Sequence, residues 1–137
     1  MAGYSGTPLV QKLGIKPNHR VALVAAPPDF ALGALPAGAV LLTNGRGRAL
    51  DVILFFATSR SRLVKQFAGL TARLTPAGGL WVVWPKKASG VATDLSEDVI
   101  RAIGLEAGLV DNKVCAVDDT WSGLRFVIRL KDRPRQV

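Results

Sequence analysis

Apolar runs of strand length alternate along the chain with segments whose apolar residues recur at helical spacing. Residues 21–26, 50–57 and 80–84 are nearly continuous apolar runs, which is typical of strands buried on both faces. Three further segments have weaker strand character. The pattern thus predicts six strands, at residues 21–26, 39–43, 50–57, 80–84, 112–117 and 124–130.

Helical spacing appears in residues 59–74, where apolar side chains recur every three or four positions. A glycine- and proline-containing stretch, residues 75–79, should end this helix before the next strand begins. A short helix is expected at Leu9–Leu13, with Thr7 as its N-cap and Gly14 as its stop.

A third helix is predicted where Asp94 is followed three residues later by Glu97, a spacing that resembles a capping box. The apolar residues after this pair lie on one helical face, and Gly104 follows them. Residues 118–123 should form the loop of a final hairpin. Alternating strands and helices indicate parallel βαβ units with helices on both faces of the sheet.

We therefore predict one α/β domain over residues 1–137. Its expected class is a three-layer, Rossmann-like fold with a mostly parallel sheet and a C-terminal antiparallel hairpin. A chain of 137 residues has room for one core, and 49% hydrophobic residues suit a globular protein.

The charge balance favours anionic partners, because 18 Lys and Arg residues against 10 Asp and Glu residues give a net charge of +8. The basic residues are dispersed along the chain, so a solubilising surface explains them equally well. Cys115 is the one cysteine, which excludes an internal disulfide and suits a reducing cytoplasm. No apolar run approaches the length of a membrane span, so no membrane partner is expected.

Three segments resemble parts of the S-adenosylmethionine-dependent methyltransferase fold, in a shortened form. LGIKPNHRVALV (residues 13–24) is similar to the lead into the first strand of that fold. LDVILFF (residues 50–56) is similar to its fourth strand, and LTPAGGLWVVWPK (residues 74–86) to the passage into its fifth. The resemblance implies a Rossmann-like sheet with a cofactor site at its carboxyl edge.

The glycine-rich turn that such a cofactor needs is missing after the first strand, where residues 25–30 read AAPPDF. Pro27 and Pro28 have no N–H group to offer a ligand, and they fix the backbone. The acidic residue that would hold ribose hydroxyls after the second strand is also absent from residues 42–45, LTNG. The sequence therefore predicts no cofactor and argues against an enzyme.

Longer literal segments resemble a small bacterial family of uncharacterised proteins, the domain-of-unknown-function family three-zero-five-two. They are MAGYSGTPLVQKLGIK (residues 1–16), WPKKASGVATDLSEDVIR (84–101) and GLVDNKVCAVDDTWSGLRFVIRLKDR (108–133). The family has no established activity, so the resemblance assigns no role to any residue.

The best candidate site is the edge of the sheet where parallel strands end, because loops and helix N-termini converge there. Residues 27–29, 58–62, 85–94 and 118–123 should meet at this edge. Besides Asp29, they supply ten candidate ligand-binding residues: Lys86, Lys87, Ser89, Thr93, Arg60, Arg62, Asp118, Asp119, Trp121 and Ser122. The same residues could instead form a salt-bridged cluster that only orders the loops.

The leading hypothesis is a non-catalytic binding or regulatory module for a small anionic or nucleotide-like ligand, or for a protein partner. The alternative is a divergent methyltransferase, and nucleic-acid binding ranks third because no known motif supports it. A metal site or a histidine-based triad is not expected, since His19 has no second histidine to join it. No catalytic residue, oligomeric state or pathway follows from the sequence.

Overall fold

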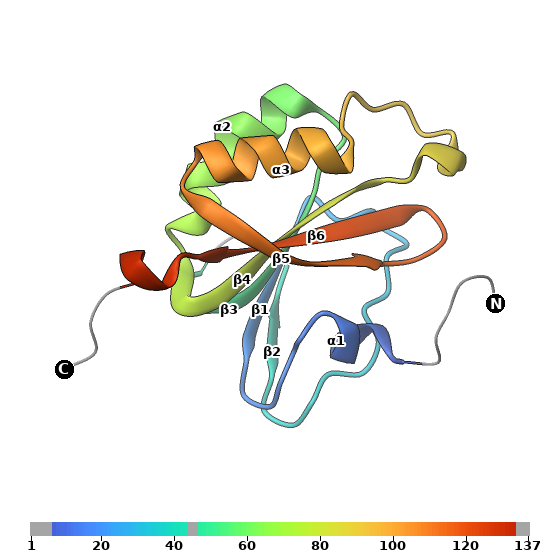
Figure 1. Ribbon diagram of the computed structural model, residues 1–137. Helices are drawn as coiled ribbons and strands as arrows, with labels where there is room; N and C mark the ends of the chain where they lie inside the picture. Colours follow the sequence, from blue (N-terminus) through green and yellow to red (C-terminus); the bar gives the residue numbers. More distant parts are fainter. Residues whose placement is uncertain (1–6, 44–46, 134–137) are drawn as a thin grey trace.

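The six strands form one sheet in the order β2-β1-β3-β4-β6-β5 (Figure 1). The structure is a computed structural model, and it describes residues 7–43 and 47–133. The strands are β1 (Arg20–Val24), β2 (Val40–Leu42), β3 (Leu50–Phe56), β4 (Leu74–Pro85), β5 (Leu109–Ala116) and β6 (Trp121–Ile128).

Strands β1, β2, β3 and β4 pair in parallel, whereas β6 pairs antiparallel with both β4 and β5. The sheet is thus mostly parallel and is completed by an antiparallel C-terminal hairpin, which confirms the predicted fold class. Because β6 runs against β4, Trp121 at its start lies opposite Pro85 at the end of β4. The hairpin turn therefore lies at the carboxyl edge of the parallel strands.

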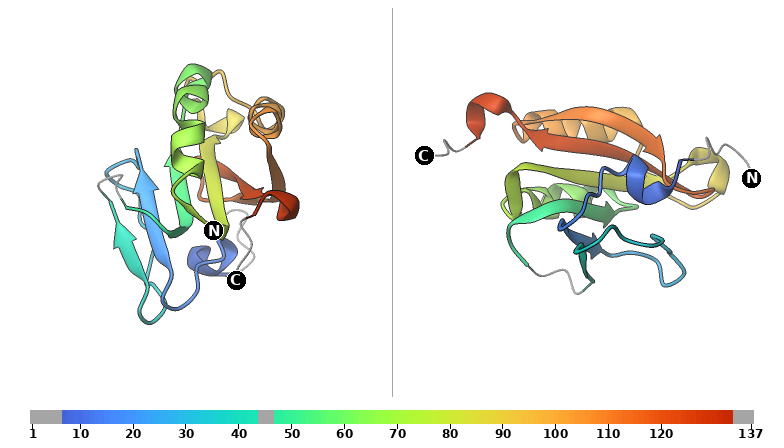
Figure 2. Two further views of the ribbon diagram at one scale, coloured as in Figure 1. Left: turned by 90° about the vertical axis from the view of Figure 1, so that its left-hand side faces the viewer. Right: turned by 90° about the horizontal axis from the view of Figure 1, so that it is seen from below.

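Helices α2 (Arg60–Thr71) and α3 (Glu97–Glu106) cover one face of the sheet (Figures 1 and 2). Ser59 caps α2 by accepting a hydrogen bond from Arg62 N at 3.1 Å. The apolar faces of the two helices meet the sheet in a core in which the rings of Phe67 and Phe126 pack edge-to-face with centroids 5.4 Å apart. Within residues 7–43 and 47–133, no helix is long and apolar enough to cross a membrane.

The other face is covered by the short helix α1 (Leu9–Lys12) and by the irregular segment 25–39 (Figure 2). The buried Trp81 indole donates a hydrogen bond from Nε1 to the Leu13 carbonyl at 3.1 Å, which fixes α1 on the sheet. Helices were predicted on both faces of the sheet, and on this second face the short helix α1 is the one α-helix among the described residues. Trp81 and Trp84 belong to the cores of opposite faces, as their spacing in the strand predicts.

The helix ends before residue 75 as predicted, but the predicted start of the next strand at residue 80 is wrong, because β4 already begins at Leu74 and pairs there with Leu50 of β3. The register then shifts, so that Val52 pairs with Gly79. A Cβ at Gly78 would lie 2.8 Å from the Leu50 carbonyl oxygen, too close for any other residue type. The glycine that suggested a break instead permits a close approach of two strands.

Two predicted helix caps also differ from the structure. Ser96 caps α3 by accepting a hydrogen bond from Val99 N at 3.3 Å, and Asp94 lies outside the helix. Pro8 occupies the N-cap position of α1, where no side chain caps the helix, so Thr7 does not have the predicted role. Ser96 is as good an N-cap as Asp94 in sequence terms, and the pattern alone could not separate them.

The final hairpin is longer than predicted and its loop is shorter, covering residues 117–120. The pairing of β5 with β6 is interrupted by a bulge between Asp111 and Lys113. Asp111 lies opposite Phe126 on the helix-covered face, and Lys113 lies opposite Arg125 on the other face. The bulge therefore turns a run of polar residues towards both faces of the hairpin.

Gly104 on α3 and Gly69 on α2 provide a matched test of this packing. A Cβ at residue 104 would overlap the ring of Phe126, whereas a Cβ at residue 69 would meet nothing within 4 Å. Gly104→Ala should lower the free energy of unfolding by about 1–3 kcal/mol through overpacking. Gly69→Ala should raise it by up to about 1 kcal/mol, because alanine favours a helix interior. Urea unfolding of both variants checks the packing, and equal effects would contradict it.

Candidate functional site

Hydrogen bonds join three of the predicted segments at the carboxyl edge. Lys86 N donates to Thr120 O at 2.7 Å, which ties the end of β4 to the hairpin turn. Thr93 Oγ1 donates to Thr58 O at 2.6 Å, which ties the loop before α3 to the loop before α2. The fourth segment, residues 27–29, leads to Phe30. The ring of Phe30 packs against that of Phe56 at the end of β3, with the ring centroids 4.8 Å apart. The strand ends thus converge as expected.

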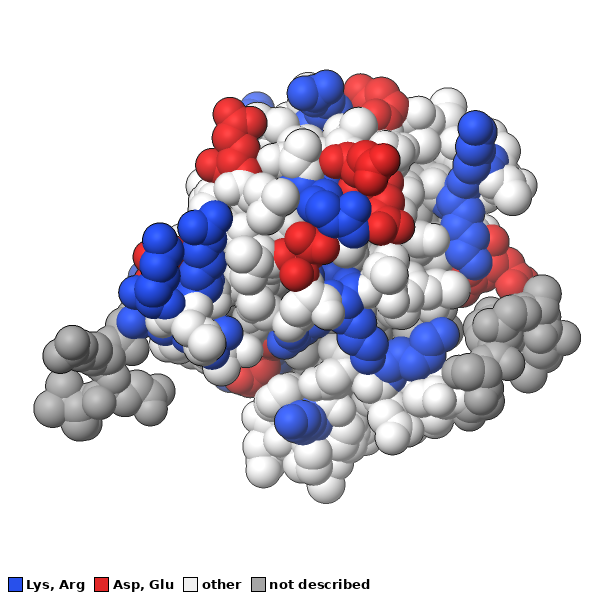
Figure 3. All heavy atoms as spheres, viewed as in Figure 1, with Lys and Arg blue, Asp and Glu red and all other residues white. Residues whose placement is uncertain are grey.

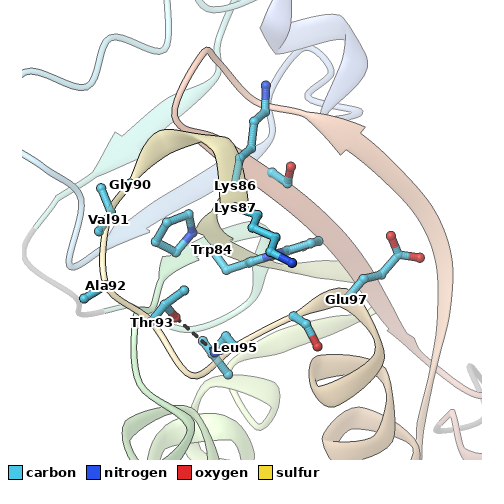
Figure 4. Close-up of a pocket in the computed structure, with 12 residues that line it drawn as sticks. Trp84, Lys86, Lys87, Gly90, Val91, Ala92, Thr93, Leu95 and Glu97 are labelled. Carbon is cyan, nitrogen blue, oxygen red and sulfur yellow. Dashed lines mark hydrogen bonds between the residues drawn. The ribbon is translucent and has the colours of Figure 1, made fainter.

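A pocket of about 700 Å³ opens at this edge, between the β4–α3 connection and the start of β6 (Figure 4). We call it the β4–α3 pocket. It is lined by Trp84, Pro85, Lys86, Lys87, Gly90, Val91, Ala92, Thr93, Leu95, Ser96, Glu97 and Ser122. Apolar and polar groups both contribute, as in sites for small molecules.

The two lysines of this pocket point in different directions. Lys87 extends beside Trp84 towards the side on which Glu97 lies (Figure 4). Lys86 extends away from the other labelled residues, so it contributes its backbone but not its ammonium group (Figure 4). Only one of the two predicted lysines therefore offers its charge to a ligand in the pocket.

The one carboxylate at the pocket, that of Glu97, is already paired. Arg101 Nη2 lies 2.6 Å from Glu97, and the same guanidinium contacts Asp98 at 3.4 Å and Asp111 at 2.9 Å. The hydrogen bonds that Arg101 donates to Glu97 and Asp111 raise the pKa of its guanidinium above the ordinary value, so it stays charged. Among the described residues, no carboxylate forms an ion pair with Lys87. The pocket therefore has one free cationic group.

Two of the predicted hydroxyls serve to shape the loop. Ser89 Oγ donates to Lys86 O at 2.6 Å and accepts from Val91 N at 3.2 Å. Thr93 Oγ1, which donates to Thr58 O, also accepts from Leu95 N at 3.0 Å. These hydrogen bonds engage both hydroxyls with the backbone of the loops, whereas the salt-bridged cluster considered from the sequence does not form among the described residues.

The acidic candidates and Trp121 lie outside the β4–α3 pocket. Asp118 Oδ1 accepts hydrogen bonds from Thr120 N and Trp121 N, both at 2.8 Å, and thereby shapes the hairpin turn. Trp121 packs edge-to-face against Phe56 with centroids 5.2 Å apart, on the face opposite α2 and α3. Asp29 and Asp119 are exposed. No ion pair joins the predicted acidic and basic groups within the described ranges.

The two predicted arginines lie in the first turn of α2. Arg60 N donates to Asp94 Oδ1 at 2.7 Å, and Arg62 N donates to the Ser59 cap. Neither side chain lines the β4–α3 pocket. Of the ten predicted residues, Lys86, Lys87, Thr93 and Ser122 line this pocket.

Several lining residues were missed by the sequence analysis, above all Trp84, Ser96 and Glu97. Trp84 was assigned to the core, and only 7% of its surface is exposed. It reaches the pocket because it is the penultimate residue of β4, next to Pro85. Its position at the end of a buried strand was the one feature of the sequence that could have indicated Trp84 as a pocket residue.

A second hollow of about 360 Å³ lies at the carboxyl ends of β1 and β2, and we call it the β1–β2 hollow. It is lined by Leu23, Ala25, Ala26, Pro27, Pro28, Phe30 and Thr43. Ala25, the first residue after β1, has a φ of +59°, the left-handed conformation that glycine adopts most easily. The backbone thus makes a tight turn here without a glycine.

Within the described ranges, no group of three or more His, Cys, Asp or Glu side chains is placed to hold a metal ion. Cys115 is half-buried on β5, and burial raises the pKa of its thiol above the ordinary value. The thiol therefore has little thiolate character at neutral pH.

Comparison with known proteins gives a clear result at the level of the fold. No family model matches the chain, and no curated protein matches its sequence. A SAM dependent methyltransferase from Aquifex aeolicus superimposes with a TM-score of 0.63 and 15% identity, over 88% of both chains. Magnesium protoporphyrin IX methyltransferase from Synechocystis PCC 6803, with bound SAH, gives a TM-score of 0.55 and 12% identity, over 88% of this chain and 78% of that one.

A third similar structure is the PH0226 protein from Pyrococcus horikoshii OT3, with a TM-score of 0.51 and 8% identity, over 88% of this chain and 86% of that one. The chain has a methyltransferase-like Rossmann fold. At identities of 8–15%, the likeness is one of fold.

Asp94 offers a test of the loop connections. Asp94→Ala removes the acceptor for Arg60 N at the start of α2, so it should lower the free energy of unfolding by about 1 kcal/mol. Asp119→Ala is the control, because Asp119 is exposed in the hairpin loop, and its effect should stay within about 0.5 kcal/mol. Equal stabilities of the two variants in urea unfolding would contradict the role of Asp94.

Proposed function

We propose that the protein is a divergent S-adenosylmethionine-dependent methyltransferase that binds its cofactor in the β1–β2 hollow. The observation that supports this most strongly is the likeness to the Aquifex methyltransferase, which extends over 88% of both chains with a TM-score of 0.63. In open α/β sheets, ligands bind at the carboxyl ends of the strands. The β1–β2 hollow lies at two of those ends.

The residues of the hollow fit one part of the cofactor, the adenosine. Leu23, Pro27 and Phe30 offer apolar surface for an adenine ring, and the exposed Thr43 offers a hydroxyl at the end of β2. Ala25, where the backbone turns in a left-handed conformation after β1, and Ala26 line the hollow beside them. These groups would hold the nucleoside by burial of its base and by one hydroxyl contact.

The hollow lacks the groups that would hold the charged part of the cofactor. Pro27 and Pro28 donate no hydrogen bonds, and no carboxylate lines the hollow. S-adenosylmethionine supplies a methyl group on a positively charged sulfur, and the protein carries a net charge of +8. Because its lining contains no carboxylate, the hollow should bind S-adenosylhomocysteine, whose sulfur is neutral, more tightly than S-adenosylmethionine.

Calorimetric titration with both ligands tests this proposal. We expect weak binding, with S-adenosylhomocysteine the tighter ligand. Thr43→Trp should abolish binding by filling the hollow from its exposed side, whereas Thr43→Ser keeps the hydroxyl and should preserve it. No heat with either ligand at millimolar concentration, or equal binding by the two variants, would overturn the proposal. Methyl transfer is then assayed with candidate acceptors.

A second candidate function is the binding of a small anionic ligand, such as a nucleotide or a phosphorylated metabolite, in the β4–α3 pocket. The specific observation in its favour is the combination of a volume of about 700 Å³ with the ammonium group of Lys87 beside Trp84. The indole and Pro85 give such a ligand an apolar wall, and Lys87 gives it a charge. If the pocket binds such a ligand but catalyses no reaction, the protein is a binding or regulatory module.

The two lysines provide a matched pair for testing this pocket. Lys87→Ala removes the charge beside Trp84 and should weaken binding of a nucleotide such as AMP by roughly ten-fold or more, as for other hydrogen bonds to charged groups. Lys86→Ala removes the same charge from a side chain that points away, so binding should change by less than about three-fold. Equal losses in calorimetric titrations of the two variants would contradict a site in the pocket.

A further inference from the structure

Four basic residues gather on the face of the sheet that α2 and α3 do not cover. They belong to α1, β5, β6 and the segment after the short helix η2 (Leu130–Asp132), and we call them the basic face: Lys12, Lys113, Arg125 and Arg133. Figure 3 shows blue side chains gathered below the β5–β6 hairpin and beside α1. They come from distant parts of the sequence, so no run of charge in the chain reveals them.

The contacts of these residues show that they are neighbours. Lys113 Nζ donates to the Lys12 carbonyl at 2.6 Å, which joins β5 to α1. Lys113 lies directly opposite Arg125 in the register of β5 and β6. Arg133 Nε donates to Ile128 O at 3.0 Å, which places Arg133 at the end of β6, the strand that carries Arg125. The basic face thus runs from Lys12 to Arg133.

Arg125 occupies the middle of this row and is partly buried. Its guanidinium lies against the backbone of Gly79, where a Cβ would collide with it, and Nη1 donates to Asn112 Oδ1 at 3.3 Å. Burial is the first cause of its lowered pKa, and the repulsion from Arg133 is the second. A like-charged neighbour raises the free energy of a guanidinium that has already lost part of its hydration.

Among the described residues, no carboxylate forms an ion pair with any member of the basic face. The ion pairs in the described part of the chain all belong to Arg101, on the opposite face. Asp111, the acidic residue nearest in sequence to Lys113, is turned to that face by the bulge and binds Arg101 at 2.9 Å. The acidic and basic groups of the hairpin are therefore separated onto its two faces, and an external anion would relieve the repulsion on the basic one.

The form of the basic face favours an extended anion over a small one. Neither the β4–α3 pocket nor the β1–β2 hollow is lined by any of its four residues, and Lys113 is exposed. Solvent-exposed cationic side chains bind a single phosphate weakly, because water and salt screen their charge. A polyanion instead gains free energy from the counterions that it releases when several cations neutralise its charges together.

We propose that the basic face binds the phosphate backbone of a nucleic acid, without reading its bases. The guanidinium of Arg125 can donate to a phosphate oxygen, and the other three groups extend the row to neighbouring phosphates. The hairpin presents no exposed ring to stack on bases, since Trp121 packs against Phe56. This inference does not depend on which ligand the β4–α3 pocket or the β1–β2 hollow binds.

Fluorescence anisotropy with a labelled single strand of about 20 nucleotides, and with the duplex of the same sequence, tests the proposal. For four phosphate contacts, the logarithm of the association constant should fall with the logarithm of salt concentration with a slope of about −3 on the single strand. Raising the salt from about 50 to about 200 mM should thus weaken binding by roughly fifty-fold. Different base sequences should bind alike.

Two double variants with the same loss of charge separate the basic face from the overall charge. In the double variant Lys12→Ala, Lys113→Ala, the slope should change from about −3 to about −1.5, because two phosphate contacts are lost. Lys65→Ala with Arg48→Gln removes two charges from exposed positions on α2 and before β3, and should leave the slope unchanged. Circular dichroism of both variants establishes that they are folded.

Three outcomes would overturn the proposal. They are no binding of either probe at low salt, an equal change in slope for the two double variants, and equal competition by polyglutamate of the same charge. The last would show that the face binds polyanions in general. Retained binding of S-adenosylhomocysteine by the Lys12→Ala, Lys113→Ala variant would show that a loss of nucleic-acid binding is separate from the β1–β2 hollow.

Discussion

The position of β4 between a parallel and an antiparallel neighbour is the constraint on which the rest of the structure depends. This strand pairs with β3 in one direction and with β6 in the other. Its residues from Gly78 to Pro85 are buried, with Trp81 in one core and Trp84 in the other. Because β6 must run against it, the hairpin turn meets the ends of the parallel strands, and both candidate hollows lie at that edge.

Much of the fold could be predicted from the sequence, because buried strands and amphipathic helices have distinct periods. Strand β3, for example, was predicted as residues 50–57 and is observed as Leu50–Phe56. The failures occurred where tertiary contacts override local signals. In the sequence, Gly78 indicated a loop between the helix and the next strand. In the structure it permits the close approach of β4 to the Leu50 carbonyl. Asp94 has the spacing of a cap for α3, yet it binds the start of α2 instead.

The candidate site was predicted less well, since a loop sequence reveals which groups are near an edge but not where they point. Lys86 and Lys87 are adjacent in the chain and identical in type, and only the fold turns one towards Trp84 and the other away. Ser89 and Thr93 looked available for a ligand, but their hydroxyls bind the backbone around them. The basic face was missed altogether, because its residues come from α1, β5, β6 and the segment after η2, and only the fold brings these parts of the chain together.

The bulge between Asp111 and Lys113 also bears on how the molecule meets other copies of itself. Strand β5 is one border of the sheet, and a straight border strand offers unpaired N–H and C=O groups to any passing chain. Here the bulge breaks that row of groups in the middle, and an exposed lysine follows it. At the other border β2 is only three residues long. Neither border presents the long, flat template on which aggregation by strand addition depends.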